Sequence, residues 1–441
     1  MSAVEKAIVA QRATPELAAY YADSRLMWRN IILIGICNMG WGLVFTIVGP
    51  LMTLKLLESG FAEGIQGTLT AANSVLSSFF VMYFSWKSDH TVSAFGRRKP
   101  FLFLSAPFII LSILLFAFND YKWSLLIFMA VQMLFMDVKL STFSLLPIDC
   151  IPREKLARIM SVLAIVGGLM GFLSMRNMGT LLAVGEWMPY VLGAGVMTLT
   201  TASSYFIKEP PIKKTSARGF RLWSVFEVGW KDRRMILLML GVGTVSSFIC
   251  MNDTWSWFWA KTALGLEKKD IFEAVSWCAL INVALAYPVG YVIDRWGGLK
   301  VTIVYWGLQV LCFFMAMNVY NKLSFTLLMM TASIAVPLYS AADIMVYKTV
   351  DPADVGSITS CNSFMRNAYR GALVFCSGWL ISLTGQNYKL AFMIGILMST
   401  LGLLLMFAYQ RIVLSSEASK NDSDGLLKAD RECISLPALE E

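Results

Sequence analysis

Long apolar runs alternate with short polar segments along the whole chain, and this pattern predicts its secondary structure. About twelve of the runs are long enough to cross a hydrocarbon core of roughly 30 Å as helices. They cover residues 29–54, 66–86, 100–118, 123–148, 157–178, 186–207, 235–261, 270–293, 300–319, 323–348, 356–383 and 387–411. We therefore predict an all-α membrane protein with twelve transmembrane helices.

The polar segments divide this pattern into regions. Residues 1–28 carry both acids and bases, so they are neither a signal peptide nor a span, and we expect a cytoplasmic N-terminal segment. Residues 412–441 are rich in Ser, Asp, Glu and Lys and predict a disordered cytoplasmic tail. Between them we expect an N-terminal six-helix bundle at 29–207, a cytoplasmic linker at 208–234 and a C-terminal six-helix bundle at 235–411.

Composition supports the membrane assignment. The 441 residues are 57% hydrophobic and only 15% charged, with a mean hydropathy of +0.62, which is far from the values of soluble proteins. A net charge of +8 could suit nucleic acid, but the cations lie in clusters between apolar runs, as membrane topology requires. The single histidine, His90, and eight cysteines without a CxxC pair predict no metal site, no disulfide framework and no cofactor.

Lysine and arginine predict the orientation. They are concentrated in the connections after even-numbered helices, chiefly at residues 87–99, 153–158 and 208–234. Because cytoplasmic loops retain such residues, both termini are expected in the cytoplasm. The expected membrane is a plasma membrane or a bacterial inner membrane. In the longest connection, Phe220, Trp223, Phe226 and Trp230 recur every three or four residues, which predicts an interfacial amphipathic helix; a plain linker is the alternative.

The two halves of the chain carry similar loops after helices 2 and 8. Each has an acid at the helix end, together with glycine and cations. The residues are Asp89, Gly96, Arg97 and Arg98 in the first copy and Asp294, Arg295 and Gly297 in the second. A duplicated six-helix unit is typical of transporters that bind solute between two halves. Ion pairs in these loops would form in one conformation and break in the other, as a conformational gate; alternatively they are topology determinants worth under about 1 kcal/mol each.

The duplicated loop resembles the signature of the major facilitator superfamily. Its longer first copy, residues 88–101, is similar to the form found in glycoside-pentoside-hexuronide:cation symporters and sucrose-type carriers. Residues 146–154 and 208–211 are similar to further segments of that group. The resemblance implies two six-helix bundles, alternating access, and sugar uptake coupled to protons or sodium. One departure favours protons: helix 2 has no carboxylate before Asp89, whereas sodium-coupled melibiose-type carriers have acids there.

Asp137 is the clearest ionisable residue in the middle of an apolar span. Placing a charge at this depth costs at least about 2.5–3.5 kcal/mol, so such groups normally face a cavity or a partner. We predict that Asp137 binds the coupling proton; a structural ion pair with a basic residue of a neighbouring helix is the alternative. Lys139, two positions along, points to another side of the helix.

Other polar and aromatic residues within the spans are candidates for contact with solute. Amides and carboxylates bind sugar hydroxyls, and aromatic faces cover the C–H surface of the ring. These candidates are Asn252, Asp253 and Trp255 in helix 7, Asn38 and Trp41 in helix 1, and Arg366 and Arg370 in helix 11. Trp257 and Trp259 are expected in the interfacial aromatic belt. The arginines, with Arg176, could instead neutralise Asp137 or hold an anionic solute, and Arg176 could extend to the interface.

Together these features predict a monomeric secondary active transporter that needs only its solute, a coupling cation and the bilayer. The preferred solute is a sugar or glycoside, carried by proton symport. The alternatives are a carrier of an organic anion or another polar solute, and a membrane sensor with a transporter fold that does not transport. We predict no enzyme activity, because the chain has no HExxH, GxSxG or P-loop motif.

Overall fold

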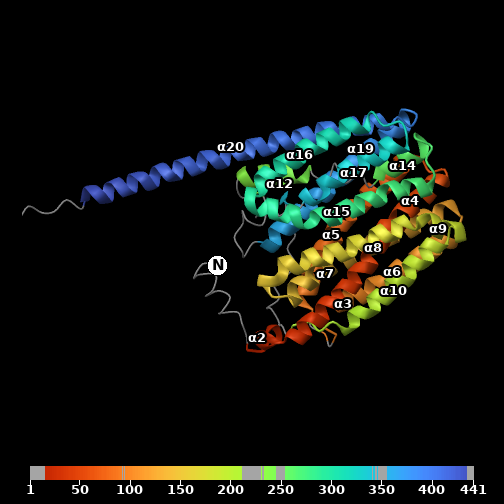
Figure 1. Ribbon diagram of the computed structural model, residues 1–441, viewed down its shortest axis with the longest axis horizontal. Coiled ribbons are helices and arrows are strands. Elements are labelled where there is room, and N and C mark those ends of the chain that lie inside the picture. Colours follow the sequence, from red (N-terminus) through yellow and green to blue (C-terminus); the bar gives the residue numbers. More distant parts are fainter. Residues whose placement is uncertain are drawn as a thin grey trace, which may run out of the picture.

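A computed structural model describes residues 15–91, 93, 95–210, 230, 233–244, 254–339, 341–342, 345 and 355–434. Side chains are not described at residues 15–18, 46–47, 89–90, 153–158, 161, 234, 294, 355–360 and 413–434 within these ranges, nor at Arg233. The described residues form helices and no strands, and the helices pack side by side in one elongated bundle (Figure 1). The all-α prediction is therefore confirmed.

The first half of the chain passes through the bundle six times. A short helix, α2 (Pro15–Ala22), precedes the first passage, which consists of α3, the π-helical turn η1 and α4. The elements of this half are α3 (Ser24–Leu43), η1 (Val44–Val48), α4 (Gly49–Glu58), α5 (Glu63–His90), α6 (Lys99–Phe118), α7 (Lys122–Cys150), α8 (Arg153–Arg176), α9 (Met178–Val184), α10 (Met188–Ser203) and η2 (Ser204–Phe206).

The second half repeats this arrangement. Its first passage has two described parts, α12 and α14, and the segment between them lies outside the described residues. The elements are α12 (Arg233–Gly243), α14 (Ser256–Thr262), α15 (Lys268–Trp296), α16 (Gly298–Ala316), α17 (Lys322–Leu338), α19 (Val355–Leu383) and α20 (Tyr388–Ile434). The described segments thus overlap all twelve expected spans.

Several of these helices are suited to a membrane by length and composition. Five described helices, α6, α7, α15, α16 and α20, contain windows apolar enough to cross it, and α8 with α9 makes a sixth that is bent by 51°. Serine and threonine hydroxyls within the helices donate to carbonyls one turn earlier, as Ser105 does to Phe101 (2.9 Å), so these polar residues need no water. The protein is a multi-pass integral membrane protein.

The bundle has two ends, which we name by their position. The terminal end carries α2, the loop before α6 and the end of α10; the distal end carries α4, α9 and α14 (Figure 1). The halves meet along two helix pairs, α5 with α19 and α8 with α15. Glycines bring the first pair together: a Cβ on Gly378 of α19 would lie 3.2 Å from Cα of Gly67 on α5.

The last helix differs from the sequence expectation. The described backbone of α20 is helical as far as Ile434 and projects beyond the bundle (Figure 1), whereas a disordered tail was expected from residue 412. Elongation of an existing helix avoids the cost of nucleation, which a composition argument does not include. The amphipathic helix predicted around residues 220–230 lies outside the described residues, apart from Trp230, and stays a prediction.

Candidate functional site

A cavity of about 350 Å³ lies between the two halves, within the size range of pockets for small molecules. Helices of both bundles line it. Its polar and aromatic lining includes Gln66, Thr70, Asn73, Gln132 and Asp137 from the first half, and Thr254, Ser256, Trp257, Asn282 and Arg370 from the second. Methionines supply much of the rest, so the cavity combines hydrogen-bonding groups with adaptable apolar surface.

Asp137 is part of this cavity wall. Asn73 of α5 donates to its Oδ2 atom at 3.4 Å, and Ser77 of the same helix also hydrogen-bonds with it. Arg370 of α19 is close enough for its positive charge to interact with the carboxylate across the cavity. The sequence left a coupling site and an ion pair as alternatives. The basic neighbour comes from the opposite half, and both roles of Asp137 stay predictions.

The other predicted charged residues lie away from the cavity. Arg366 stacks on the ring of Tyr339 at 4.4 Å and hydrogen-bonds with its hydroxyl, inside the C-terminal half. Lys139 points into the N-terminal half, where its Nζ donates to Thr201 at 2.5 Å. Arg370 is therefore the only residue of the predicted arginine pair among the residues that line the cavity.

Most of the predicted solute-binding residues of helices 1 and 7 that the structure describes contact other residues of the protein. Trp255 is fully buried and donates from Nε1 to Ser377 at 2.8 Å. Asn38 donates to the Leu163 carbonyl at 2.6 Å, which fixes α3 on α8. Trp41 borders a separate void of about 10 Å³, too small for a sugar. Asn252 and Asp253 lie outside the described residues, so their role stays a prediction.

Two tryptophans are placed differently from the sequence expectation. Trp257 and Trp259 are 6% and 5% exposed, so the prediction of an interfacial aromatic belt is wrong for both. Trp257 lines the cavity, and Trp259 packs on Phe392 with ring centroids 4.8 Å apart. Composition cannot distinguish an indole at the membrane interface from one inside the bundle, because both positions lie near a helix end.

Sequence reasoning missed most of the polar cavity lining. Gln66, Thr70 and Asn73 are spaced by four and three residues, which places them on one face of α5. Gln132 and Asn282 are single amides within apolar runs of α7 and α15. The periodicity on α5 and the isolated amides were both readable signals, since a membrane helix rarely places amides toward lipid.

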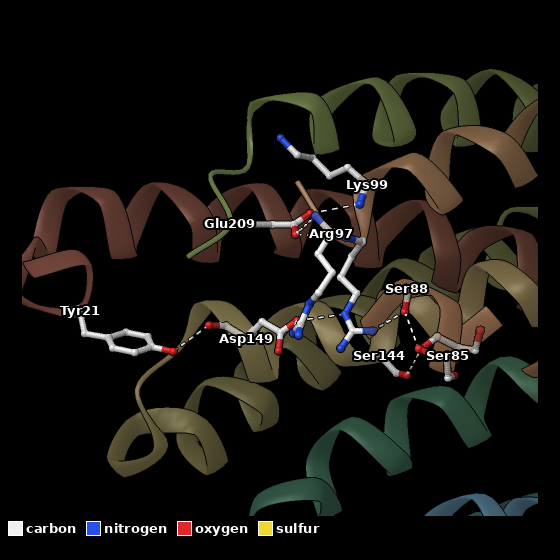
Figure 2. Close-up of polar contacts among 10 residues, drawn as sticks. Tyr21, Ser85, Ser88, Arg97, Lys99, Ser144, Asp149 and Glu209 are labelled. Atoms are coloured by element: carbon white, nitrogen blue, oxygen red, sulfur yellow. Dashed lines mark hydrogen bonds and ion pairs between the residues drawn. The ribbon is translucent and has the colours of Figure 1, made fainter. Parts of the chain in front are cut away.

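Two predicted gate residues of the first loop, Arg97 and Arg98, belong to a polar cluster at the terminal end (Figure 2). Glu209, just after η2, accepts hydrogen bonds from the backbone N–H groups of Arg97 (2.6 Å), Arg98 and Lys99 (both 3.1 Å). Its carboxylate therefore caps the start of α6, where the helix dipole favours a negative charge. Gly96 has φ of 109° and a Cβ there would lie 2.7 Å from this carboxylate, so the loop requires glycine.

Asp149, at the end of α7, joins the same cluster. Arg97 and Arg98 approach its Oδ2 at 2.6 and 3.0 Å, and Arg98 also contacts Ser88 of α5. The hydroxyl of Tyr21 in α2 donates to the Asp149 carbonyl at 2.9 Å. Neither Asp149 nor Glu209 was among the predicted gate residues, because their positions in the sequence do not show that they approach this loop.

The remaining gate residues are not brought together in this way. Asp89 lies in the last turn of α5, and its side chain is not described; the side chain of Asp294 in α15 is not described either. Arg295 is exposed and makes no polar contact with another described residue. Gly297 has φ of 82° and begins the turn to α16. The structure therefore supports a loop-organising role for the first copy, and the gating role of both copies stays a prediction.

We expect Glu209→Ala to destabilise the protein by about 1 kcal/mol, because three backbone N–H groups at the start of α6 lose their acceptor. Thermal unfolding of the detergent-solubilised protein measures this. Glu267→Ala is the matched control, since Glu267 precedes α15 without a side-chain hydrogen bond to it. Equal stability of the two variants would contradict the capping role.

Ion pairs and hydrogen bonds join the two halves at the distal end. Lys268 of α15 approaches Glu58 of α4 at 2.7 Å and Glu186 at 2.8 Å. Arg176 of α8 pairs with Glu273 of α15 at 2.6 Å. These contacts lie where α4, α9 and α14 end, beyond the cavity.

Below this layer, hydrogen bonds from α19 and α20 to α5 close the same end. The hydroxyl of Tyr388, at the start of α20, donates to Glu63 of α5 at 2.7 Å, and Trp379 donates to Thr68 at 3.1 Å. Glu63 is only 2% exposed. At the terminal end, by contrast, the polar cluster around Asp149 and Glu209 joins segments of the first half to each other. The structure is therefore a conformation closed at its distal end.

We expect Lys268→Gln to weaken distal closure by about 1 kcal/mol, since it removes the cation shared by Glu58 and Glu186. Hydrogen exchange of residues 63–70 should rise up to about fivefold, and unchanged exchange would contradict this. The hydrogen bond from Lys268 holds the pKa of Glu186 below its ordinary value. The contact is therefore present at neutral pH and is lost only as the pH falls through that lowered pKa, so it predicts no pH dependence between about pH 6 and 8.

Comparisons with known proteins agree with this architecture. Residues 34–319 match the family model described as Major Facilitator Superfamily. The structure of the nucleoside transporter NupG aligns with a TM-score of 0.65 and 14% identity, over 88% of this chain and 99% of that one. A bacterial homologue of the human lysosomal transporter Spinster, in an inward-facing and unoccupied conformation, gives 0.64 and 11%, over 91% and 98%. No curated protein matches the sequence.

Proposed function

Since the chain belongs to the major facilitator superfamily and is a secondary transporter, we propose that its solute is a sugar or glycoside and that protons drive its uptake. The observation that carries this proposal is the cavity between the halves, with amides, hydroxyls and the indole of Trp257 in its wall. Hydroxyl groups both donate and accept hydrogen bonds, as amides do, and an indole can cover the apolar face of a sugar ring.

The charges in the cavity favour a neutral solute. Asp137 and Arg370 interact with one another, so the described wall carries one negative and one positive group. An organic anion would need an excess of cations, but Arg366 contacts Tyr339 and Arg176 pairs with Glu273. In this proposal Asp137 carries the coupling proton, and protonation removes the negative charge that attracts Arg370 across the cavity.

The orientation completes the cycle. With both termini in the cytoplasm, as the cation distribution predicts, the distal end faces outward and the structure corresponds to an outward-closed state. Outward opening then requires the contacts of Lys268 and Tyr388 to break. A sensor that does not transport would bind solute without completing this cycle.

Uptake into proteoliposomes tests the proposal. The labelled panel contains sucrose, maltose, melibiose, glucose, the nucleoside uridine and citrate, each with an imposed proton or sodium gradient. Uridine is included because Trp257 could also stack on a base and because the fold resembles that of a nucleoside transporter. Sugar accumulation that follows the proton gradient is expected. Accumulation of citrate alone, or solute binding without uptake, would contradict the proposal.

A further inference from the structure

We infer that Gln132 and Asn282 form a pair of solute-binding amides, one from each half, that selects a solute with hydroxyl groups at two places. This inference rests on the proposed function and adds the residues that recognise the solute. Gln132 lies on α7, five positions before Asp137, and Asn282 lies on α15. Both side chains line the same cavity.

Their hydrogen bonding sets these amides apart. Gln132 is 5% exposed, yet its amide makes no hydrogen bond with another described residue. The Oδ1 atom of Asn282 is buried and likewise has no partner among the described residues. A buried amide without a partner costs about 1–3 kcal/mol, so most buried amides are paired. The Asn282 oxygen is such a group, and the amide of Gln132 is open to the same cavity, so a solute there can provide the partners that the described protein does not.

Other amides of the protein differ from this pair in their position or in their contacts. Gln309 of α16 is fully buried outside the cavity; its Oε1 accepts from Ser399 at 3.2 Å, and its Nε2 has no partner among the described residues. Asn73, in the cavity wall, donates to Asp137. Gln66 keeps only a long contact of 3.9 Å from Nε2 to the sulfur of Met129, and its Oε1 has no partner among the described residues. Gln66 therefore lies beside the pair as a further hydrogen-bonding group.

The chemistry of an amide restricts the solute. Each amide offers two N–H groups and one carbonyl oxygen, so a hydroxyl satisfies it better than a group that only accepts or only donates. Because the two amides belong to different halves, a solute that reaches both stabilises the conformation in which the halves meet at the distal end. A neutral compound with hydroxyls on opposite sides meets both conditions.

The test compares KM values for the compound of the panel that the wild type accumulates best. Gln132→Met and Asn282→Leu remove each amide at nearly constant volume, and each is expected to raise KM roughly tenfold. Gln309→Met is the matched control and should leave KM unchanged, whatever it does to stability. If Gln132→Met does not reach the membrane, Gln132→Asn shortens the side chain, retains the amide, and should also raise KM.

Monodeoxy analogues separate direct contact from a structural role. In the wild type, the analogue that lacks the hydroxyl in contact with an amide should have a KM roughly tenfold above that of the parent compound. In the variant without that amide, the analogue and the parent compound should have the same KM. Variants that keep the wild-type KM and discrimination would overturn the inference while transport stands. A wild type that accumulates none of the panel would contradict the proposed function itself.

Discussion

Asp137→Asn is expected to abolish proton-driven accumulation while solute exchange continues. Asparagine keeps the shape of the side chain and can still hydrogen-bond with Asn73 and Ser77, but it cannot bind and release a proton. If one proton enters with each solute, a gradient of about one pH unit supports roughly tenfold accumulation. The variant should reach an inside-to-outside ratio of about one.

Proteoliposome uptake measures this ratio, and counterflow without a gradient measures exchange. Asp120→Asn is the matched control, since Asp120 is exposed at the distal end and approaches Lys55 at 3.4 Å, away from the cavity. If accumulation persists in Asp137→Asn, a group other than Asp137 must bind the coupling proton. Loss of counterflow as well would indicate that Asp137 and Arg370 serve the structure of the cavity rather than coupling.

Gly378→Leu is expected to hold the distal end open and to slow transport at least tenfold. A Cβ at Gly378 would lie 2.8 Å from the Glu63 carbonyl oxygen, 3.1 Å from Trp255 and 3.2 Å from Gly67. Two of these neighbours are backbone atoms of α5, which cannot turn aside as a side chain can. Overpacking of this kind costs about 1–3 kcal/mol or more, and only the closed conformation bears the part of the cost that comes from α5.

Hydrogen exchange of residues 63–70, together with the uptake rate, checks this expectation. Exchange should rise in the variant because α5 loses its contact with α19. Gly195→Leu in α10 is the matched control, since a Cβ at Gly195 meets nothing within 4 Å. A Gly378→Leu protein with wild-type uptake and protection would show that α5 and α19 do not need this close approach.

Both ends of α5 contact residues that are distant in the sequence. At its distal end, Glu63 and Thr68 pair with Tyr388 and Trp379, more than 300 residues away in the chain. Nothing in the local pattern around Glu63 indicates these partners, because they come from the last two helices. At its terminal end the loop motif was recognised, yet the carboxylate that caps α6 is Glu209, from the end of the sixth passage.

Asp137 shows what local reasoning can achieve. A carboxylate in the middle of an apolar run is costly wherever it lies, so the sequence alone predicts a functional role for it. Its partner does not follow. Arg366 and Arg370 are one turn apart and chemically identical, and only the packing of α19 directs Arg370 toward the cavity and Arg366 toward Tyr339.

By itself the sequence determined that this protein is an all-α membrane transporter of the major facilitator superfamily. The length of the apolar runs, the charge distribution and the duplicated loop are all set by residues that lie close together in the chain. Only the tertiary structure decided which polar side chains line the cavity, that Trp255 is structural while Trp257 faces the cavity, and that the distal end is closed. Those features depend on the rotation and close approach of helices from different halves. A small rotation about the helix axis changes which residues face the cavity, and it leaves the hydrophobic pattern almost unaltered.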